Sequence, residues 1–133
     1  MSLQKDEWRF ELDPTLEAIE EVCANFRVWR AQTCADLEQF PAELLLREAL
    51  TNSVAHGCPK GSSARIRVVL RAKQRRLFIA VQDEGEGFDW RAAWNKRADA
   101  SDTHGRGVEI FRQYANSVRF NPKGNSVILI KRF

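Results

Sequence analysis

The sequence lacks the patterns of a membrane or secreted protein. No apolar run approaches the ~20 residues that a membrane span requires. The segment from Met1 to Glu11 alternates polar and apolar residues and has no continuous apolar stretch like that of a signal peptide. Hydrophobic residues make up 44% of the chain and charged residues 29%, a balance typical of globular domains. We therefore expect one cytoplasmic domain over residues 1–133.

Cysteine and histidine are scarce. The three cysteines, Cys23, Cys34 and Cys58, are widely spaced, and none belongs to a Cys-x-x-Cys pair. Such an odd, scattered set is typical of reduced and mostly buried thiols. His56 and Cys58 form one His-x-Cys pair, but a zinc site needs a second ligand pair that the sequence does not have. We expect neither a disulfide framework nor a zinc centre.

Several common signatures of nucleotide and nucleic-acid sites are also missing. The sequence has no Gly-x-x-x-x-Gly-Lys-Ser/Thr loop, no complete Gly-x-Gly-x-x-Gly, and neither the His-Arg-Asp nor the Asp-Phe-Gly motif of protein kinases. The net charge is +3, and basic residues are densest over positions 65–76. Most of them alternate with Ile66, Val68 and Leu70, which indicates the solvent face of a strand. Nucleic-acid binding therefore ranks last among the functions considered.

Hydrophobic periodicity predicts an alternation of strands and helices. Asp13 followed by Pro14 predicts a helix start with Asp13 as its N-cap, and Gly57 predicts the end of a second helix. The expected elements are a strand over 7–12, helices over 14–31 and 41–57, strands over 64–71 and 76–82, a glycine-bearing loop over 83–88, an irregular polar stretch over 89–103, a helix over 108–114, and strands over 118–121 and 126–133. This order favours an α+β fold with all helices on one face of a sheet.

Three polar residues share one stripe of the second expected helix. Glu48, Asn52 and His56 follow one another at intervals of four residues, so their side chains lie along one face. An asparagine offers a neutral carbonyl oxygen that suits a hard ion such as Mg²⁺. A glutamate can accept a proton from an attacking hydroxyl group or water. Taken alone, the same spacing also fits an ordinary polar helix face.

A glycine-bearing loop follows the strand expected over 76–82. Gly85 and Gly87 allow the backbone to turn sharply and to approach a ligand closely. Asp83, at the strand end, offers a carboxylate that can accept a hydrogen bond from the amino group of a base. Taken alone, this Asp-x-Gly-x-Gly pattern is also compatible with a surface turn.

A second glycine pair precedes the helix expected over 108–114. The N-terminus of a helix presents free N–H groups and the positive end of the helix dipole, both of which attract anions. Gly105 and Gly107 would let the backbone approach such an anion, and Arg106 adds a forked donor that suits phosphate. Taken alone, the pattern also fits a plain helix start.

In this order and within one small domain, the three clusters resemble the GHKL (Bergerat-fold) ATPase superfamily. Residues 48–57 resemble its N box, residues 83–89 its first glycine box, residues 104–108 its second glycine box, and residues 118–128 its closing hairpin. The short single-domain chain is most similar to the branch of anti-sigma-factor serine/threonine kinases. The resemblance implies a Bergerat-type α/β sandwich, with a mixed and mostly antiparallel sheet and helices on one face.

The resemblance also implies roles for individual residues. Asn52 would coordinate a Mg²⁺ ion that bridges the phosphates of ATP, and Glu48 would be the base toward a protein hydroxyl group. Asp83 would bind the adenine amino group, while Gly85 and Gly87 would shape the adenine pocket. The phosphates would be held by Gly105, Arg106 and Gly107.

The activity implied by the resemblance is an ATP-dependent serine/threonine protein kinase. Its substrate would be a small anti-anti-sigma (STAS) protein, and the kinase would form a homodimer that sequesters a sigma factor without membrane attachment. An alternative is a regulatory module that changes shape with its nucleotide and transfers no phosphate. The same domain also occurs within larger two-component or phosphatase regulators.

Overall fold

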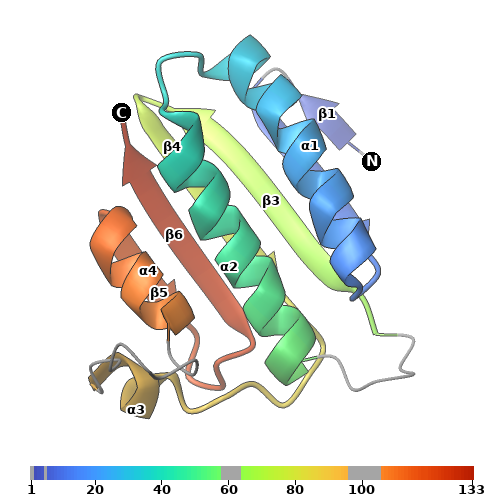
Figure 1. The fold of residues 1–133 in the computed structure, drawn as a ribbon, viewed down its shortest axis with the longest axis vertical. Helices are drawn as coiled ribbons and strands as arrows, with labels where there is room; N and C mark the ends of the chain where they lie inside the picture. The colour runs from blue at the N-terminus through green and yellow to red at the C-terminus, as the bar shows by residue number, and fades with distance from the viewer. Residues whose placement is uncertain (1, 5, 58–63, 96–105) are drawn as a thin grey trace.

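A six-stranded sheet carries three helices on one of its faces (Figure 1). The computed structural model describes residues 2–4, 6–57, 64–95 and 106–133. The strand order is β1-β2-β3-β4-β6-β5, and every pairing among the described strands is antiparallel. The strands are β1 (Ser2–Gln4), β2 (Glu7–Leu12), β3 (Ile66–Lys73), β4 (Arg76–Gln82), β5 (Ser117–Phe120) and β6 (Ser126–Arg132).

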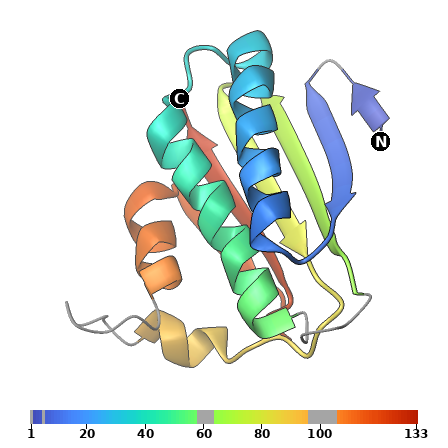
Figure 2. The same cartoon turned by 45° about the vertical axis from the view of Figure 1, so that its right-hand side comes forward.

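In the described part of the chain, three of the four helices cover the sheet, and the fourth is short. They are α1 (Leu16–Thr33), α2 (Gln39–Gly57), α3 (Trp90–Asn95) and α4 (Arg106–Tyr114). α1, α2 and α4 lie on the same face, and α3 lies at one end of the molecule (Figures 1 and 2). This architecture confirms the predicted α+β sandwich of Bergerat type.

The start of α1 corrects one prediction. Thr15, and not Asp13, is the N-cap, because its hydroxyl group accepts a hydrogen bond from the N–H of Ala18 at 3.1 Å. The Asp13 carboxylate instead pairs with Arg65 at 2.9 Å, at the start of the neighbouring strand. Two short elements, β1 and α3, were not expected from the periodicity.

The core lies between the sheet and the two long helices. Along β3, Ile66, Val68 and Leu70 are buried, while Arg67 and Arg71 are exposed, so the predicted solvent face of this strand is confirmed. Phe26 of α1 and Leu46 of α2 are fully buried over the sheet. Full burial of each such side chain contributes about 1.5–3 kcal/mol to stability, which holds the helices in fixed positions.

Two cysteines belong to this core. Cys23 and Cys34 are buried free thiols, and burial raises the pKa of each to about 11. Cys58 lies outside the described residues. Among the residues that the structure describes, no helix is both long and apolar enough to cross a bilayer.

The chain brings several element ends together at one end of the sheet. α2 and β4 both finish there, the turn between β5 and β6 lies there, and α4 begins there (Figure 2). This convergence gathers residues that are far apart in the sequence around one cavity.

Candidate functional site

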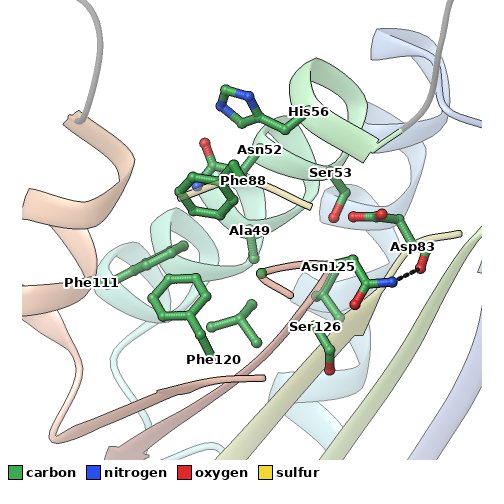
Figure 3. Close-up of a pocket in the computed structure, with 13 residues that line it drawn as sticks. Ala49, Asn52, Ser53, His56, Asp83, Phe88, Phe111, Phe120, Asn125 and Ser126 are labelled. Atoms are coloured by element: carbon green, nitrogen blue, oxygen red, sulfur yellow. Dashed lines mark hydrogen bonds between the residues drawn. The ribbon is translucent and has the colours of Figure 1, made fainter. Parts of the chain in front are cut away.

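A cavity opens at the end of the sheet where these elements meet (Figure 3). Its walls come from α2, the end of β4 and the loop that follows it, β5, the β5–β6 turn, the start of β6, and α4. The lining residues are Ala49, Asn52, Ser53, His56, Val81, Asp83, Phe88, Phe111, Phe120, Gly124, Asn125, Ser126 and Val127. Two residues predicted from different motifs, Asn52 and Asp83, therefore share one site.

The last two turns of α2 form the polar wall of the cavity. Asn52 and His56 both line it, as their spacing along the helix predicts. Ser53, which the motif analysis did not single out, also lines the cavity and is buried. Glu48 lies one turn before Asn52 and is half-buried, but it does not line the cavity. Burial raises the pKa of the Glu48 carboxyl group above its ordinary value of 4.5, while the nearby Arg47 acts in the opposite direction.

Asp83 is a buried carboxylate at the end of β4. Burial raises its pKa above the ordinary value of 3.8, and hydrogen bonds from the Gly85 N–H and the Ser53 hydroxyl group oppose this shift. The Gly85 N–H donates to Oδ1 of Asp83 at 2.8 Å. A carboxylate held this way, with little competing water, is a strong acceptor for an N–H group of a ligand.

Gly57 and Gly85 allow α2 and the glycine loop to pack closely. A Cβ atom on Gly85 would lie 2.1 Å from the carbonyl oxygen of Gly57. Real Cβ contacts are never this short, so any side chain at Gly85 would push the loop away from the helix. The absence of a side chain at Gly85 therefore allows the loop backbone to lie directly against the end of α2.

The loop also interlocks with the turn between β5 and β6. Gly87 has φ +79°, and a Cβ atom there would lie 1.9 Å from the carbonyl oxygen of Lys123. Gly124 has φ +82°, and a Cβ atom there would lie 2.3 Å from the carbonyl oxygen of Phe88. Each glycine thus makes room for the backbone of the opposite segment.

Aromatic rings form the apolar wall of the cavity. The Phe88 ring stacks on the His56 ring, with centroids 5.0 Å apart and planes 14° apart. Phe120 meets Phe88 edge to face at 5.6 Å and lies 6.3 Å from Phe111. The wall suits the flat apolar faces of a ligand ring. Because Phe111 and Phe120 come from α4 and β5, only the tertiary structure reveals this wall.

The second glycine cluster is described only in part. Arg106 and Gly107 form the first turn of α4, whereas Gly105 and the Arg106 side chain lie outside the described residues. α4 reaches the cavity through Phe111. Phosphate binding by Gly105, Arg106 and Gly107 therefore stays a prediction.

Comparison with known proteins defines the class of this molecule. The model of the histidine kinase-like ATPase domain matches residues 12–131, so the chain belongs to this family. Among curated proteins it is similar to the anti-sigma F factor of Clostridium acetobutylicum, with 27% identity over 132 aligned positions that cover 92% of this chain and 76% of that protein. These matches confirm the predicted resemblance to GHKL ATPases of the anti-sigma branch, and the family implies that the site binds ATP.

The polar and aromatic groups that line the cavity are compatible with this ligand. The buried Asp83 carboxylate can accept from the amino group of adenine, and the rings beside it provide an apolar surface. The described residues include no group of three His, Cys, Asp or Glu side chains that could hold a metal ion by themselves. A magnesium ion near Asn52 would therefore take most of its oxygen ligands from phosphates and water, as Mg²⁺ commonly does.

Proposed function

We propose that this chain is an ATP-dependent serine/threonine protein kinase that acts as an anti-sigma factor. The observation that carries the proposal is the meeting of Asn52 and Asp83 in one cavity of a histidine kinase-like ATPase domain. The similarity to a protein named anti-sigma F factor supports the regulatory role. In this proposal residues 1–133 form one ATP-binding domain that works in the cytoplasm as a homodimer, sequesters a sigma factor and phosphorylates a small anti-anti-sigma (STAS) protein.

Each residue has a defined task in this mechanism. Asp83 accepts a hydrogen bond from the adenine amino group, and Gly85 and Gly87 let the loop approach the base. Asn52 contributes its amide oxygen to Mg²⁺. Bound Mg·ATP supplies a γ-phosphoryl group whose charge the metal partly neutralises. The phosphate contacts are proposed for Gly105, Arg106 and Gly107.

Glu48 is the proposed base for the transfer step. Its carboxylate accepts the proton of the partner's serine or threonine hydroxyl group while the hydroxyl oxygen bonds to the γ-phosphorus. The bond from this phosphorus to the bridging oxygen breaks, and ADP leaves. The raised pKa of Glu48 makes it a better proton acceptor than an exposed glutamate. Positioning and charge neutralisation supply most of the rate in this chemistry.

The decisive experiment incubates the protein with γ-labelled ATP, Mg²⁺ and an anti-anti-sigma protein, and compares the wild type with Glu48→Gln. The wild type should label the partner on serine or threonine. The Glu48→Gln variant should bind ATP with similar affinity and label the partner at least about 100-fold more slowly. A wild type that binds ATP and yet labels no anti-anti-sigma partner contradicts the kinase assignment.

A second candidate is a nucleotide-dependent binding module that does not transfer phosphate. The position of Glu48 favours this alternative, because the side chain does not line the cavity in the structure. Under this alternative, the wild type and Glu48→Gln should release a bound sigma factor equally well when the anti-anti-sigma protein and ATP are added.

A further inference from the structure

Asn125, in the turn between β5 and β6, holds Asp83 by its backbone. Its side-chain Nδ2 donates to the carbonyl oxygen of Asp83 at 3.1 Å (Figure 3). The same Nδ2 also donates to the carbonyl oxygen of Gly85 at 3.4 Å. Its own carbonyl oxygen accepts from the N–H of Asp83 at 2.9 Å. The peptide groups on both sides of the Asp83 Cα are therefore bonded to one residue, which fixes the direction of the Asp83 side chain.

Asn121 in turn fixes the amide of Asn125. Nδ2 of Asn121 donates to Oδ1 of Asn125 at 2.6 Å, so the Asn125 amide is oriented with its NH₂ group toward the glycine loop. Oδ1 of Asn121 accepts from three successive N–H groups, those of Gly124, Asn125 and Ser126, at 2.8, 3.0 and 3.1 Å. These hydrogen bonds lie within the β5–β6 turn and fix its conformation independently of its contact with the glycine loop. Two asparagines link the closing hairpin to the base-binding carboxylate.

We propose that Asn125 is a positioning residue that sets the selectivity of the site for adenine through Asp83. The inference rests on the proposed function, since it assigns to Asp83 the contact with the adenine amino group. Adenine presents an amino donor at the position where guanine presents a carbonyl acceptor. A correctly aimed carboxylate attracts the first base and repels the second. Without the Asn125 amide, the backbone carbonyl groups of Asp83 and Gly85 lose a hydrogen-bond donor. The Asp83 carboxylate then loses its fixed direction.

The test measures ATP and GTP affinities for the wild type, Asn125→Ala and Asn125→Asp. Asn125→Asp keeps the size of the side chain but places an oxygen opposite the carbonyl groups of Asp83 and Gly85. Both variants should bind ATP about tenfold more weakly, and their preference for ATP over GTP should narrow.

Asn116→Ala is the matched control, because the Asn116 side chain also forms a hydrogen bond with a backbone group, at the other end of the hairpin. Its Oδ1 accepts from the N–H of Arg132 at 2.8 Å, and Asn116 does not line the cavity. This variant should destabilise the hairpin and leave the ratio of ATP to GTP affinity unchanged.

Two failures can be told apart. If the wild type does not bind ATP, the proposed function is wrong and the inference with it. The second failure requires that the wild type prefers ATP to GTP. If the folded Asn125→Ala variant then keeps the full preference, the proposed ATP site is retained and the role of Asn125 is refuted. If the control narrows the preference as much as Asn125→Ala does, hairpin stability and not Asp83 positioning explains the effect, and the inference is likewise refuted.

Discussion

A Cβ atom on Gly57 would lie 2.1 Å from the Cγ atom of Asp83, inside the space that the carboxylate occupies. The last residue of α2 therefore has no side chain, and the Asp83 carboxylate packs directly against it. The sequence offers a simpler reason for this glycine, a helix C-cap. The structure adds that the glycine makes room for the carboxylate.

Gly57→Ala should consequently damage both stability and binding. The new methyl group must displace the Asp83 carboxylate, which costs about 1–3 kcal/mol of unfolding free energy and weakens ATP binding at least about tenfold. Urea unfolding and an ATP titration measure the two effects. Ala55→Gly, at an exposed position in the same helical turn, should cost about 1 kcal/mol through helix propensity and leave ATP affinity intact. Normal ATP affinity in folded Gly57→Ala would argue against the close contact.

Asp83→Asn should abolish ATP binding and yet stabilise the protein without nucleotide. Burial raises the pKa of this carboxyl group above 3.8, so the folded state binds the proton more tightly than the unfolded state. The free energy of unfolding of the wild type therefore falls as pH rises through the window between 3.8 and the raised value. Asp83→Asn has no carboxyl group to ionise, so its free energy of unfolding does not fall in this window. The variant should therefore be more stable than the wild type at neutral pH, and this difference should vanish as pH falls below the window.

Unfolding curves of both proteins over a pH series test this sign. Asp36→Asn is the control, because Asp36 is exposed and pairs with Arg75 at 3.3 Å. Replacement of Asp36 should give no gain in stability at neutral pH. The prediction is contradicted if Asp83→Asn has a lower free energy of unfolding than the wild type at neutral pH and an equal one in acid.

The rate of phosphoryl transfer should follow the ionisation of Glu48. Its pKa is raised above 4.5 by burial, and the proposed base works only as the carboxylate. Single-turnover rates at saturating Mg·ATP should therefore fall as pH drops through this raised value. Glu48→Gln should show a low rate without this step. If the wild type and Glu48→Gln lose rate in parallel over the whole pH series, a group other than Glu48 controls the reaction.

Local patterns predicted much of the fold and singled out Asn52, His56 and Asp83, three of the polar residues that line the cavity. Ile66, Val68 and Leu70 occupy every second position, which is enough to orient β3 because the side chains of a strand alternate between its faces. Asn52 was predictable because its helix and motif are local. β1, with three residues, is too short for periodicity to show. The N-cap was predicted at Asp13 but lies at Thr15, while Asp13 pairs with Arg65, a partner that only the folded sheet places beside it.

The rest of the site depends on contacts between distant segments. Asn125 bonds to Asp83, 42 positions earlier in the chain, and nothing in the sequence near position 125 announces this partner. The ring contact between Phe88 and Phe120 likewise requires β5 to return beside the glycine loop. The two glycines at 87 and 124 were visible as turn residues, but their mutual fit with the opposite backbone was not. Pairwise geometry of this kind is a property of the tertiary fold.

An ion-pair network joins α1 to α2 on the outer surface. It makes the free energy of unfolding depend on pH in the acid range. Nε and Nη2 of Arg27 donate to the two carboxylate oxygens of Glu43 at 2.6 and 2.9 Å, and Arg47 lies 3.6 Å from the same carboxylate. The hydrogen bond from Arg27 is the main reason why the pKa of Glu43 falls below 4.5. The stabilisation is therefore complete above 4.5 and is lost as pH falls through the lowered folded value.

Glu43→Gln should lower the free energy of unfolding by about 0.5–1 kcal/mol at neutral pH, because the pair is bidentate but partly hydrated. The difference from the wild type should shrink in acid and also in high salt, which screens surface charges. Glu21→Gln, at an exposed position of α1, should change stability much less. An equal loss for both variants, or a loss from Glu43→Gln that persists in acid, would assign the effect to packing.

The turn between β3 and β4 holds two residues in a conformation that usually requires glycine or asparagine. Gln74 has φ 53° and Arg75 has φ 58°, the left-handed region that costs an ordinary residue roughly 1–2 kcal/mol. Arg75 is retained by its neighbours, since its guanidinium group lies over the Phe133 ring at 5.3 Å and pairs with Asp36. Gln74 is exposed, so Gln74→Gly can relieve the strain at one position without loss of a buried contact.

Gln74→Gly should raise the free energy of unfolding by about 0.5–1 kcal/mol, less than the full cost of the strain because glycine also gains freedom in the unfolded chain. Lys73→Gly is the matched control, since Lys73 is exposed in the extended backbone of β3 and gains nothing from glycine there. That variant should lose stability by a similar amount. Because the turn is remote from the cavity, ATP affinity should stay unchanged in both variants. Urea unfolding measures the stability of both variants. If Gln74→Gly and Lys73→Gly are destabilised equally, glycine relieves no strain in the turn.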